Sequence, residues 1–130
     1  YFNTHFDHRG EQAREESAKL IRQKIDEIAG SSPAIVTGDF NANPSSAPYR
    51  AMVAEQGLAD AMDAALLPHE GALSSFSGFL VSEGLQPNRR IDYMFLSSEI
   101  TVLKHAILTD HQEGAYPSDH LPVIAQVRLP

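Results

Sequence analysis

The sequence predicts an α/β fold in which a mixed β-sheet carries helices on one face. Two observations lead to this prediction: the chain opens on a strand–helix–strand pattern, and three further strand candidates follow in its second half. A strand–helix–strand unit favours parallel pairing, whereas strands that follow one another directly favour antiparallel pairing. With 130 residues, 42% of them hydrophobic, the chain is one domain's worth of sequence and can bury a core.

The first strand and the first helix are expected at the beginning of the chain. Residues 1–6 read as the interior of a strand, and the segment between Gly10 and Gly30 has the apolar spacing of a helix. The residues that recur there at intervals of three and four are Ala18, Ile21, Ile25 and Ile28. Gly30 is well placed to end this helix, because glycine readily adopts the backbone conformation that follows a last helical turn.

A second strand and a second helix are expected next. Residues 34–37 form a short apolar run, partly β-branched, which predicts a buried strand that brings Asp39 to its C-terminal edge. The segment 45–48 then offers serine as a cap and proline for the first turn of a helix that Gly57 would close.

The second half of the chain predicts a long loop and three strands. Residues 67–88 carry Gly, Ser and Pro with little periodicity, which indicates a loop with one short strand near Phe76. The later strand candidates are Ile91–Leu96, Thr101–Leu108 and Val123–Leu129.

Composition excludes some classes of function. The formal net charge of −7 argues against tight, sequence-independent binding to nucleic-acid phosphates, although acidic residues that hold a cation would be neutralised by it. The absence of cysteine excludes disulfides and thiolate metal sites. No run of residues approaches the roughly 18 apolar positions that a membrane-spanning helix needs.

Four short segments place polar, metal-capable residues at the ends of apolar runs. They are Asn3–His5, Gly38–Asn41, Arg90–Tyr93 and Ser118–His120. Side chains at strand ends can converge on one rim of a sheet, where a rigid scaffold holds them. Hydrolysis of a phosphoester needs such a rim, because a hard cation wants carboxylate oxygens and a water molecule must be activated beside it.

Two of the carboxylates have competing explanations. Taken alone, Asp39 after a glycine is more typical of a turn that ends a strand. Asp92 interrupts the apolar run 91–96, where a carboxylate is costly unless it is paired or hydrogen-bonded. Either Asp92 forms a structural ion pair with Arg89 or Arg90, or it orients a catalytic imidazole.

The histidines are ambiguous by themselves. Asp119 and His120 are either a turn cap and a surface histidine, or a metal ligand and an acid–base group that works near neutral pH. Neighbours in a strand point to opposite faces, so both serve one site only if the chain bends between them. His5, in a strand-like stretch, is by itself more typical of a core histidine. Three further histidines are expected to be solvent-exposed: His69, His105 and His111.

In this order, the four segments resemble the endonuclease/exonuclease/phosphatase superfamily, which includes apurinic endonucleases, deoxyribonucleases, neutral sphingomyelinases and inositol-polyphosphate phosphatases. The similarity runs from about Asn3 to the end of the chain. The opening Asn-Thr-His-Phe-Asp-His and the Phe-Ser-Gly-Phe loop at 76–79 are similar to small bacterial members. The resemblance implies a four-layer αββα sandwich with two packed sheets, of which residues 1–130 would form a partial domain, the second half.

The resemblance implies a divalent-metal-dependent phosphoester hydrolase and gives roles to the first two segments. His5 would contact the scissile phosphate or assist the leaving group. Asp39 would position and activate the attacking water and, as a metal ligand, help to hold the cation. Asn41 would hydrogen-bond the phosphoryl oxygens.

For the last two segments, the resemblance implies that Asp92 orients His120. His120 would then bind the phosphate or act as the acid–base partner, while Asp119 helps to hold the cation. Mg²⁺ or Mn²⁺ is the expected metal for an oxygen-rich site without thiolates.

The resemblance also implies that part of the site lies outside this chain. Complete members begin with an Asn-bearing strand and a Gln-Glu motif whose Glu is a principal metal ligand, and this sequence holds neither. We therefore expect a fragment that is inactive alone and is stabilised by a complementary N-terminal half or by self-association. The substrate stays open between a small molecule and nucleic acid, and a non-catalytic binding or scaffold module is the alternative function.

Overall fold

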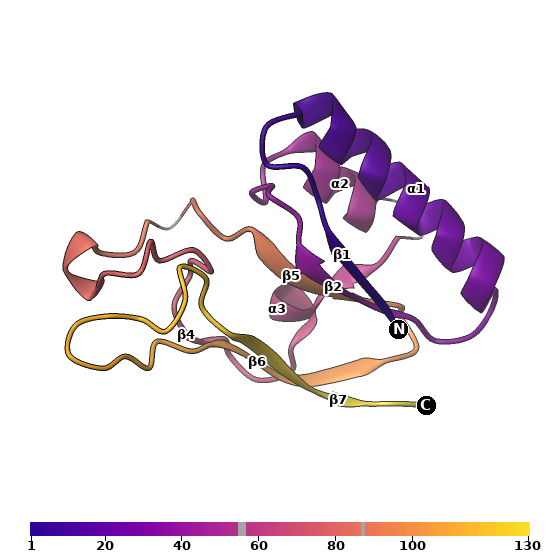
Figure 1. The fold of residues 1–130 in the computed structure, drawn as a ribbon. Helices are drawn as coiled ribbons and strands as arrows, with labels where there is room; N and C mark the ends of the chain where they lie inside the picture. Colours follow the sequence, from indigo (N-terminus) through magenta and orange to yellow (C-terminus); the bar gives the residue numbers. More distant parts are fainter. Residues whose placement is uncertain (55–56, 87) are drawn as a thin grey trace.

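A computed structural model describes residues 1–54, 57–86 and 88–130 of the chain. Within these residues, one sheet has the strand order β1-β2-β5-β3 (Figure 1). The bounds are Phe2–His5 for β1, Ile35–Asp39 for β2, Asp92–Leu96 for β5 and Ala59–Asp60 for β3. β1 pairs parallel to β2, whereas β5 runs antiparallel to both β2 and β3. The predicted mixed sheet is confirmed, and the two-residue β3 is an addition that the sequence pattern did not reveal.

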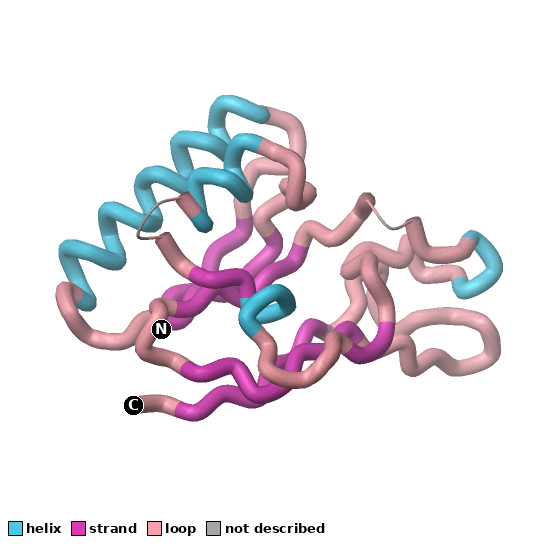
Figure 2. The backbone as a smooth tube through the Cα atoms, turned by 180° about the vertical axis from the view of Figure 1, so that it is seen from behind, coloured by secondary structure: helices cyan, strands magenta, loops and turns pink. Residues whose placement is uncertain are grey.

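A second sheet lies on the side of the first sheet that faces away from the long helix (Figure 2). In the described residues its order is β4-β6-β7, with bounds Glu70–Gly71, Thr101–Ile107 and Val123–Arg128. Leu96 of β5 and Val102 of β6 are buried between the two sheets, and Ala125 and Val127 pack against them. The last two strands therefore lie in this second sheet, which together with the short helix at Ala61–Ala64 covers the apolar face of β5 opposite the long helix.

The long helix α1 covers the outer face of the first sheet (Figure 1). It spans Glu11–Ala29 and ends at Gly30, as its sequence predicts. Ala18 and Ile25 are buried beneath it, whereas Ile28, also expected on its apolar face, is 72% exposed. No helix within the described ranges has the length and apolar character needed to cross a membrane.

The second helix, α2, spans Ala47–Val53 and packs beside α1. It begins after Ser46 and carries Pro48 in its first turn, as expected. It ends at Val53 rather than at the expected Gly57, and residues 55–56 between these points lie outside the described part.

The expected loop at 67–88 carries short elements. The short helix α3 (Ala61–Ala64) precedes it, and a single 3₁₀ turn, η1 (Val81–Glu83), follows β4 within it. Where a short strand was expected near Phe76, that residue forms an isolated β-bridge with His120. This bridge joins the loop to the segment before β7. Residue 87 lies outside the described part.

An aromatic cluster packs beneath the ends of β1, β2 and β5. Phe40 contacts Phe6, Tyr93 and Phe95 edge to face, with ring centroids 4.8, 5.7 and 5.0 Å apart. Such pairs contribute about 0.5–1.5 kcal/mol each beyond their buried area. The cluster therefore holds together the strand ends that carry Asp39 and Asp92.

The expectation that His105 is solvent-exposed is wrong. His105 lies in β6 and is only 2% exposed. Its Nδ1 is 2.9 Å from Nδ1 of His69, whose Nε2 donates to the carbonyl oxygen of Ala72 at 2.7 Å. Because that carbonyl can only accept, Nε2 of the neutral His69 ring carries the proton, and Nδ1 of His69 accepts a hydrogen bond from Nδ1–H of His105. Burial first, and then the neighbouring His69, lowers the pKa of His105 to about 4.

Acidification is therefore expected to destabilise the chain through His105. Its pKa in the folded state lies below the ordinary value of 6.5, so between these values the unfolded state binds a proton that the folded state rejects. Stability falls as the pH drops below about 6.5, by about 2 kcal/mol between about pH 7.5 and about pH 5. Urea unfolding of wild type and His105→Gln at both pH values measures this loss. His105→Gln should lose less unfolding free energy than wild type between the two pH values, whereas the exposed His111→Gln control should lose as much as wild type. Equal losses in all three proteins would contradict the role of His105.

Candidate functional site

Three strand ends bring polar side chains into one row across the first sheet. In the strand register, His5 at the end of β1 lies beside Asp39 at the end of β2, and Asp39 lies opposite Asp92 at the start of β5. Residues paired directly across strands point to the same face. His5 Nε2 is 3.3 Å from Asp39 Oδ2, and this face is the one turned away from α1. The strand register thus gathers three of the sequence-predicted residues at one rim.

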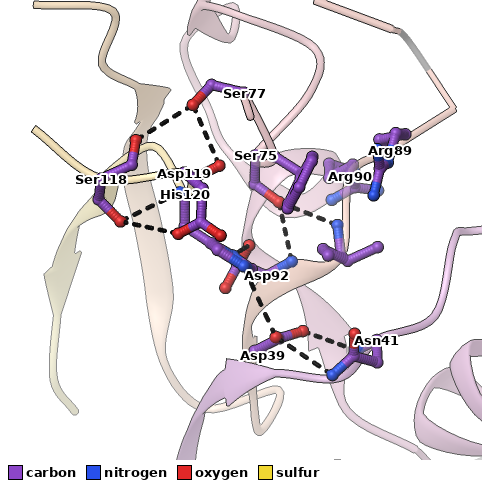
Figure 3. A network of polar contacts seen from close by, with 12 residues as sticks. Asp39, Asn41, Ser75, Ser77, Arg89, Arg90, Asp92, Ser118, Asp119 and His120 are labelled. Atoms are coloured by element: carbon purple, nitrogen blue, oxygen red, sulfur yellow. Dashed lines mark hydrogen bonds and ion pairs between the residues drawn. The ribbon is translucent and has the colours of Figure 1, made fainter. Parts of the chain in front are cut away.

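His120 completes this group from the segment that leads into β7 (Figure 3). Its Nδ1 donates to Asp92 Oδ2 at 2.8 Å, and its Nε2 lies 3.9 Å from Asp39 Oδ2. The ring edge of His120 packs on Phe76, with centroids 5.3 Å apart. Since Nδ1 faces Asp92, Nε2 is the nitrogen turned toward Asp39, and the Asp92 carboxylate keeps the proton of the neutral ring on Nδ1.

Asp92 does not form the ion pair with Arg89 or Arg90 that was one of its two explanations. Arg90 pairs with the buried Asp60 of β3, Nη1 to Oδ2 at 2.7 Å. The guanidinium of Arg89 lies over the ring of Phe76, 3.7 Å from its centroid. Asp92 therefore pairs with the imidazole of His120 instead.

Burial and hydrogen bonding act in opposite directions on this pair. Burial raises the pKa of Asp92 above its ordinary value, although hydrogen bonds with Ser75 and His120 oppose it. For His120, burial lowers the pKa, but the hydrogen bond to Asp92 and the charges of Asp92, Asp39 and Asp119 outweigh burial and raise it above its ordinary value. His120 is therefore more basic than a free imidazole and carries a positive charge more readily near neutral pH.

Asn41 fixes the orientation of Asp39. Its backbone N–H donates to Asp39 Oδ1 at 2.7 Å, and its side-chain Nδ2 donates to Asp39 Oδ2 at 3.2 Å and to the carbonyl of Phe6 at 2.9 Å. Its backbone has φ 47°, a conformation that asparagine tolerates better than most residues. Its side-chain amide thus donates to Asp39 and to the end of β1.

His5 and Asp119 lie at the margins of the group. The side chain of His5 is 73% exposed, so His5 is a surface group rather than a core histidine. Asp119 sits in a bend, and its carbonyl accepts from the backbone N–H groups of Ser77 and Gly78 at 2.6 and 3.3 Å. The bend required for Asp119 and His120 to serve one site is present, yet the Asp119 carboxylate stays outside the tightest cluster of ligand atoms found in the described residues.

That cluster consists of Asp39, Asp92 and His120. One ligand atom from each lies within 4.8 Å of the others, which is close enough for a shared metal ion. Two carboxylates with one imidazole and no thiolate suit a divalent cation of the Mg²⁺ or Mn²⁺ type by donor chemistry. A groove of about 370 Å³ runs from this cluster along the sheet face, lined by His5, Asp39 and Asp92 on one side and by Leu121 and Val123 on the other.

Sequence reasoning missed Ser75 and gave Phe76 no role in the site. Ser75 is fully buried and its Oγ accepts the backbone N–H of Asp92 (Figure 3), while Phe76 packs on His120. Ser75 lies in a segment without periodicity, so nothing local marks it. The Phe-Ser-Gly-Phe sequence that begins at Phe76 was the one available signal.

Comparisons with known proteins identify the family and the fold of the chain. The family model described as "Endonuclease/Exonuclease/phosphatase family" matches residues 2–120. A structure of such a family protein from Bacteroides thetaiotaomicron superposes with a TM-score of 0.90 at 33% identity, and covers 99% of this chain and 49% of that one. A second, from Bacteroides vulgatus, gives 0.86 at 36% identity with 99% and 50% coverage.

A mannosyl-6-phosphatase from Bacteroides thetaiotaomicron gives a TM-score of 0.87 at 33% identity, and covers 98% of this chain and 51% of that one. A search of curated proteins finds no match. The chain thus spans about half the length of the solved structures that it matches. With a family model that covers residues 2–120 and a shared fold at 33–36% identity, this chain belongs to the endonuclease/exonuclease/phosphatase family.

Proposed function

We propose that the protein that contains this chain hydrolyses a phosphoester with the help of a divalent cation. The observation that carries the proposal is the convergence of Asp39, Asp92 and His120 within 4.8 Å at the rim of the sheet. Members of this family are hydrolases that act on phosphoesters, and the same residues supply what that reaction needs.

Four side chains of the group have separate roles in the proposed reaction. Asp39, held by Asn41, positions the attacking water and accepts its proton. Asp92 keeps the proton of His120 on Nδ1, so that Nε2 is the nitrogen presented to the substrate. With its raised pKa, His120 binds a phosphoryl oxygen as a cation or donates a proton to it. The exposed His5 reaches the phosphate or the leaving group from the other side of Asp39.

The cation would be held by Asp39, with Asp92 beside it, and Asp119 would join as a ligand from the adjacent bend, although its carboxylate lies outside the tight cluster. When bound, it supplies Lewis-acid stabilisation of the charge on the phosphoryl oxygens. Oxygen ligands of this kind are those that Mg²⁺ and Mn²⁺ prefer.

The substrate proposed is a small phosphomonoester of a sugar. A mannosyl-6-phosphatase shares 33% identity over 98% of the chain. The net charge of −7 also disfavours a duplex nucleic acid, whose binding requires a basic surface.

We further propose that the residues described here are the C-terminal half of a sandwich and that a complementary half or a second copy covers the rest of the site. The support is the 49–51% coverage of the matched structures and a groove that opens along the sheet face between β1 and β7. Among the described residues, β1 is an edge strand of its sheet, and its outer edge offers backbone groups for pairing.

Metal-dependent hydrolysis is the expected result of the direct test. A chimera would fuse this chain behind the half of the Bacteroides vulgatus relative that the chain does not cover. We expect it to release phosphate from mannose 6-phosphate or p-nitrophenyl phosphate with Mg²⁺ or Mn²⁺, and to stop when EDTA is added. Turnover of bis-p-nitrophenyl phosphate instead would reassign the substrate to the diesters.

Mn²⁺ binding separates catalysis from a non-catalytic role. Electron paramagnetic resonance measures free Mn²⁺ in the presence of the chimera, and Asp39→Asn should weaken binding at least about tenfold because it removes a charged oxygen ligand. Asp110→Asn, at an exposed position outside the cluster, is the matched control. Metal binding without turnover of any ester would favour the binding-module alternative, and the absence of both would contradict the proposal.

A further inference from the structure

Ser75 lies directly behind the Asp92–His120 pair. It is fully buried, with no exposed surface, and it stands in the loop that faces the start of β5. Its Oγ accepts hydrogen bonds from the backbone N–H groups of Ile91 and Asp92, both at 2.9 Å (Figure 3). A loop hydroxyl thus takes the place that a strand carbonyl would have at the beginning of β5.

The Ser75 hydroxyl accepts two hydrogen bonds, which fill its capacity as an acceptor. A serine hydroxyl offers two lone pairs and one O–H. The two N–H groups occupy both lone pairs, so the O–H is the part of this side chain that is left to donate, and its effect on the neighbouring Asp92 carboxyl is to lower the pKa against burial. Asp92 is therefore held by Ser75 at its backbone, while Oδ2 of its carboxylate accepts from His120.

The backbone of Ser75 reaches the other partner of the pair. Its carbonyl oxygen accepts from the N–H of Leu121 at 2.7 Å, and the next residue, Phe76, forms a β-bridge with His120. One residue therefore fixes the strand end that carries Asp92 and the segment that carries His120.

We propose that Ser75 is a positioning residue that sets the geometry of the Asp92–His120 pair, through its hydroxyl on Asp92 and its backbone on the segment of His120. The proposal rests on the proposed function where it concerns activity, and on geometry alone where it concerns the pair. Ser75 touches no reacting atom. Its hydroxyl anchors the backbone from which the Asp92 carboxylate reaches Nδ1 of His120, and without that anchor the carboxylate can move away from the imidazole.

Ser74 provides a matched control in the adjacent position. It is also fully buried. Its hydroxyl lies 2.9 Å from the carbonyl oxygen of Phe76 and 3.2 Å from that of Arg89, which are backbone acceptors. Ser74→Ala thus removes a buried hydroxyl of the same loop but leaves Asp92 and its hydrogen bonds in place.

The first test measures the hydrogen bond between His120 and Asp92 at one fixed pH. In the metal-free chain, nuclear magnetic resonance detects the Nδ1 proton of His120, whose hydrogen bond to Asp92 gives it a downfield, slowly exchanging signal. We expect Ser75→Ala to shift or abolish this signal, Ser75→Thr to restore it, and Ser74→Ala to leave it unchanged. Ser75→Cys, which keeps the size but bonds weakly, replaces the alanine variant if that variant does not fold.

Activity of the chimera gives the second measurement. Ser75→Ala should lower kcat by about 10- to 100-fold with KM nearly unchanged, because the substrate is still bound while His120 is misplaced. Ser75→Thr should recover most of the rate. A wild-type His120 signal in Ser75→Ala and Ser75→Cys, or an equal change in Ser74→Ala, would overturn the proposal. If no form hydrolyses an ester, the proposed function fails, and the resonance alone decides the role of Ser75.

Discussion

Replacing His120 by glutamine is expected to lower kcat for phosphoester hydrolysis by the chimera by about 10²- to 10⁴-fold, the usual contribution of a positioned acid–base group. Glutamine can still donate a hydrogen bond to Asp92, but it has no ionisable proton to give to the substrate. The loss should therefore appear in kcat under saturating substrate. The exposed His111→Gln is the control and should retain the wild-type rate.

A double-mutant cycle with Asp92→Asn tests whether the two residues act as one unit. The 2.8 Å hydrogen bond from His120 Nδ1 is the route by which Asp92 influences the reaction. If Asp92 acts through the imidazole, Asp92→Asn lowers the rate in the wild-type background but adds little once His120 is glutamine. Fully additive losses would mean that Asp92 has its own contact with the cation or the substrate, and the orienting role would be wrong.

The parts of the fold that sequence could predict are those that depend on local pattern. The long helix and strands β2, β5, β6 and β7 appear within a few residues of their expected bounds, because periodicity and end signals are local properties. The pattern could not reveal β3, whose two residues have no periodicity. That strand carries Asp60, the buried partner of Arg90, so the choice between the two explanations of Asp92 depended on an element invisible in the sequence.

For the site too, local pattern predicts where the strands end but not which side chains meet. That Asp39 and Asp92 end or begin strands follows from the apolar runs beside them, but their position directly opposite one another depends on the register, which is set by contacts 53 residues apart in the chain. His105 was placed wrongly because its partner His69 comes from a loop, and Ser75 was missed because a serine without periodicity is marked only by what packs around it.

Gly38→Ala is expected to cost at least about 4 kcal/mol of unfolding free energy, or to prevent folding, which places it among the most damaging single substitutions. Gly38 has φ 151°, and a Cβ there would lie 1.8 Å from the carbonyl oxygen of Thr4 and 2.8 Å from its carbon. These are backbone atoms of the adjacent strand β1, so no side chain can turn aside to make room. Urea unfolding followed by circular dichroism measures the loss.

Gly84→Ala separates this steric effect from the loss of glycine itself. Gly84 also has a backbone conformation that favours glycine, φ 71° and ψ 159°, but a Cβ there meets no described atom within 4 Å, so alanine should cost about 1–3 kcal/mol. Because Gly38 immediately precedes Asp39, and Thr4 immediately precedes His5, alanine at 38 forces apart the strand ends that hold these side chains 3.3 Å from each other. If Gly38→Ala were no less stable than Gly84→Ala, the close pairing of β1 with β2 would be wrong, and with it the row of residues on which the site is built.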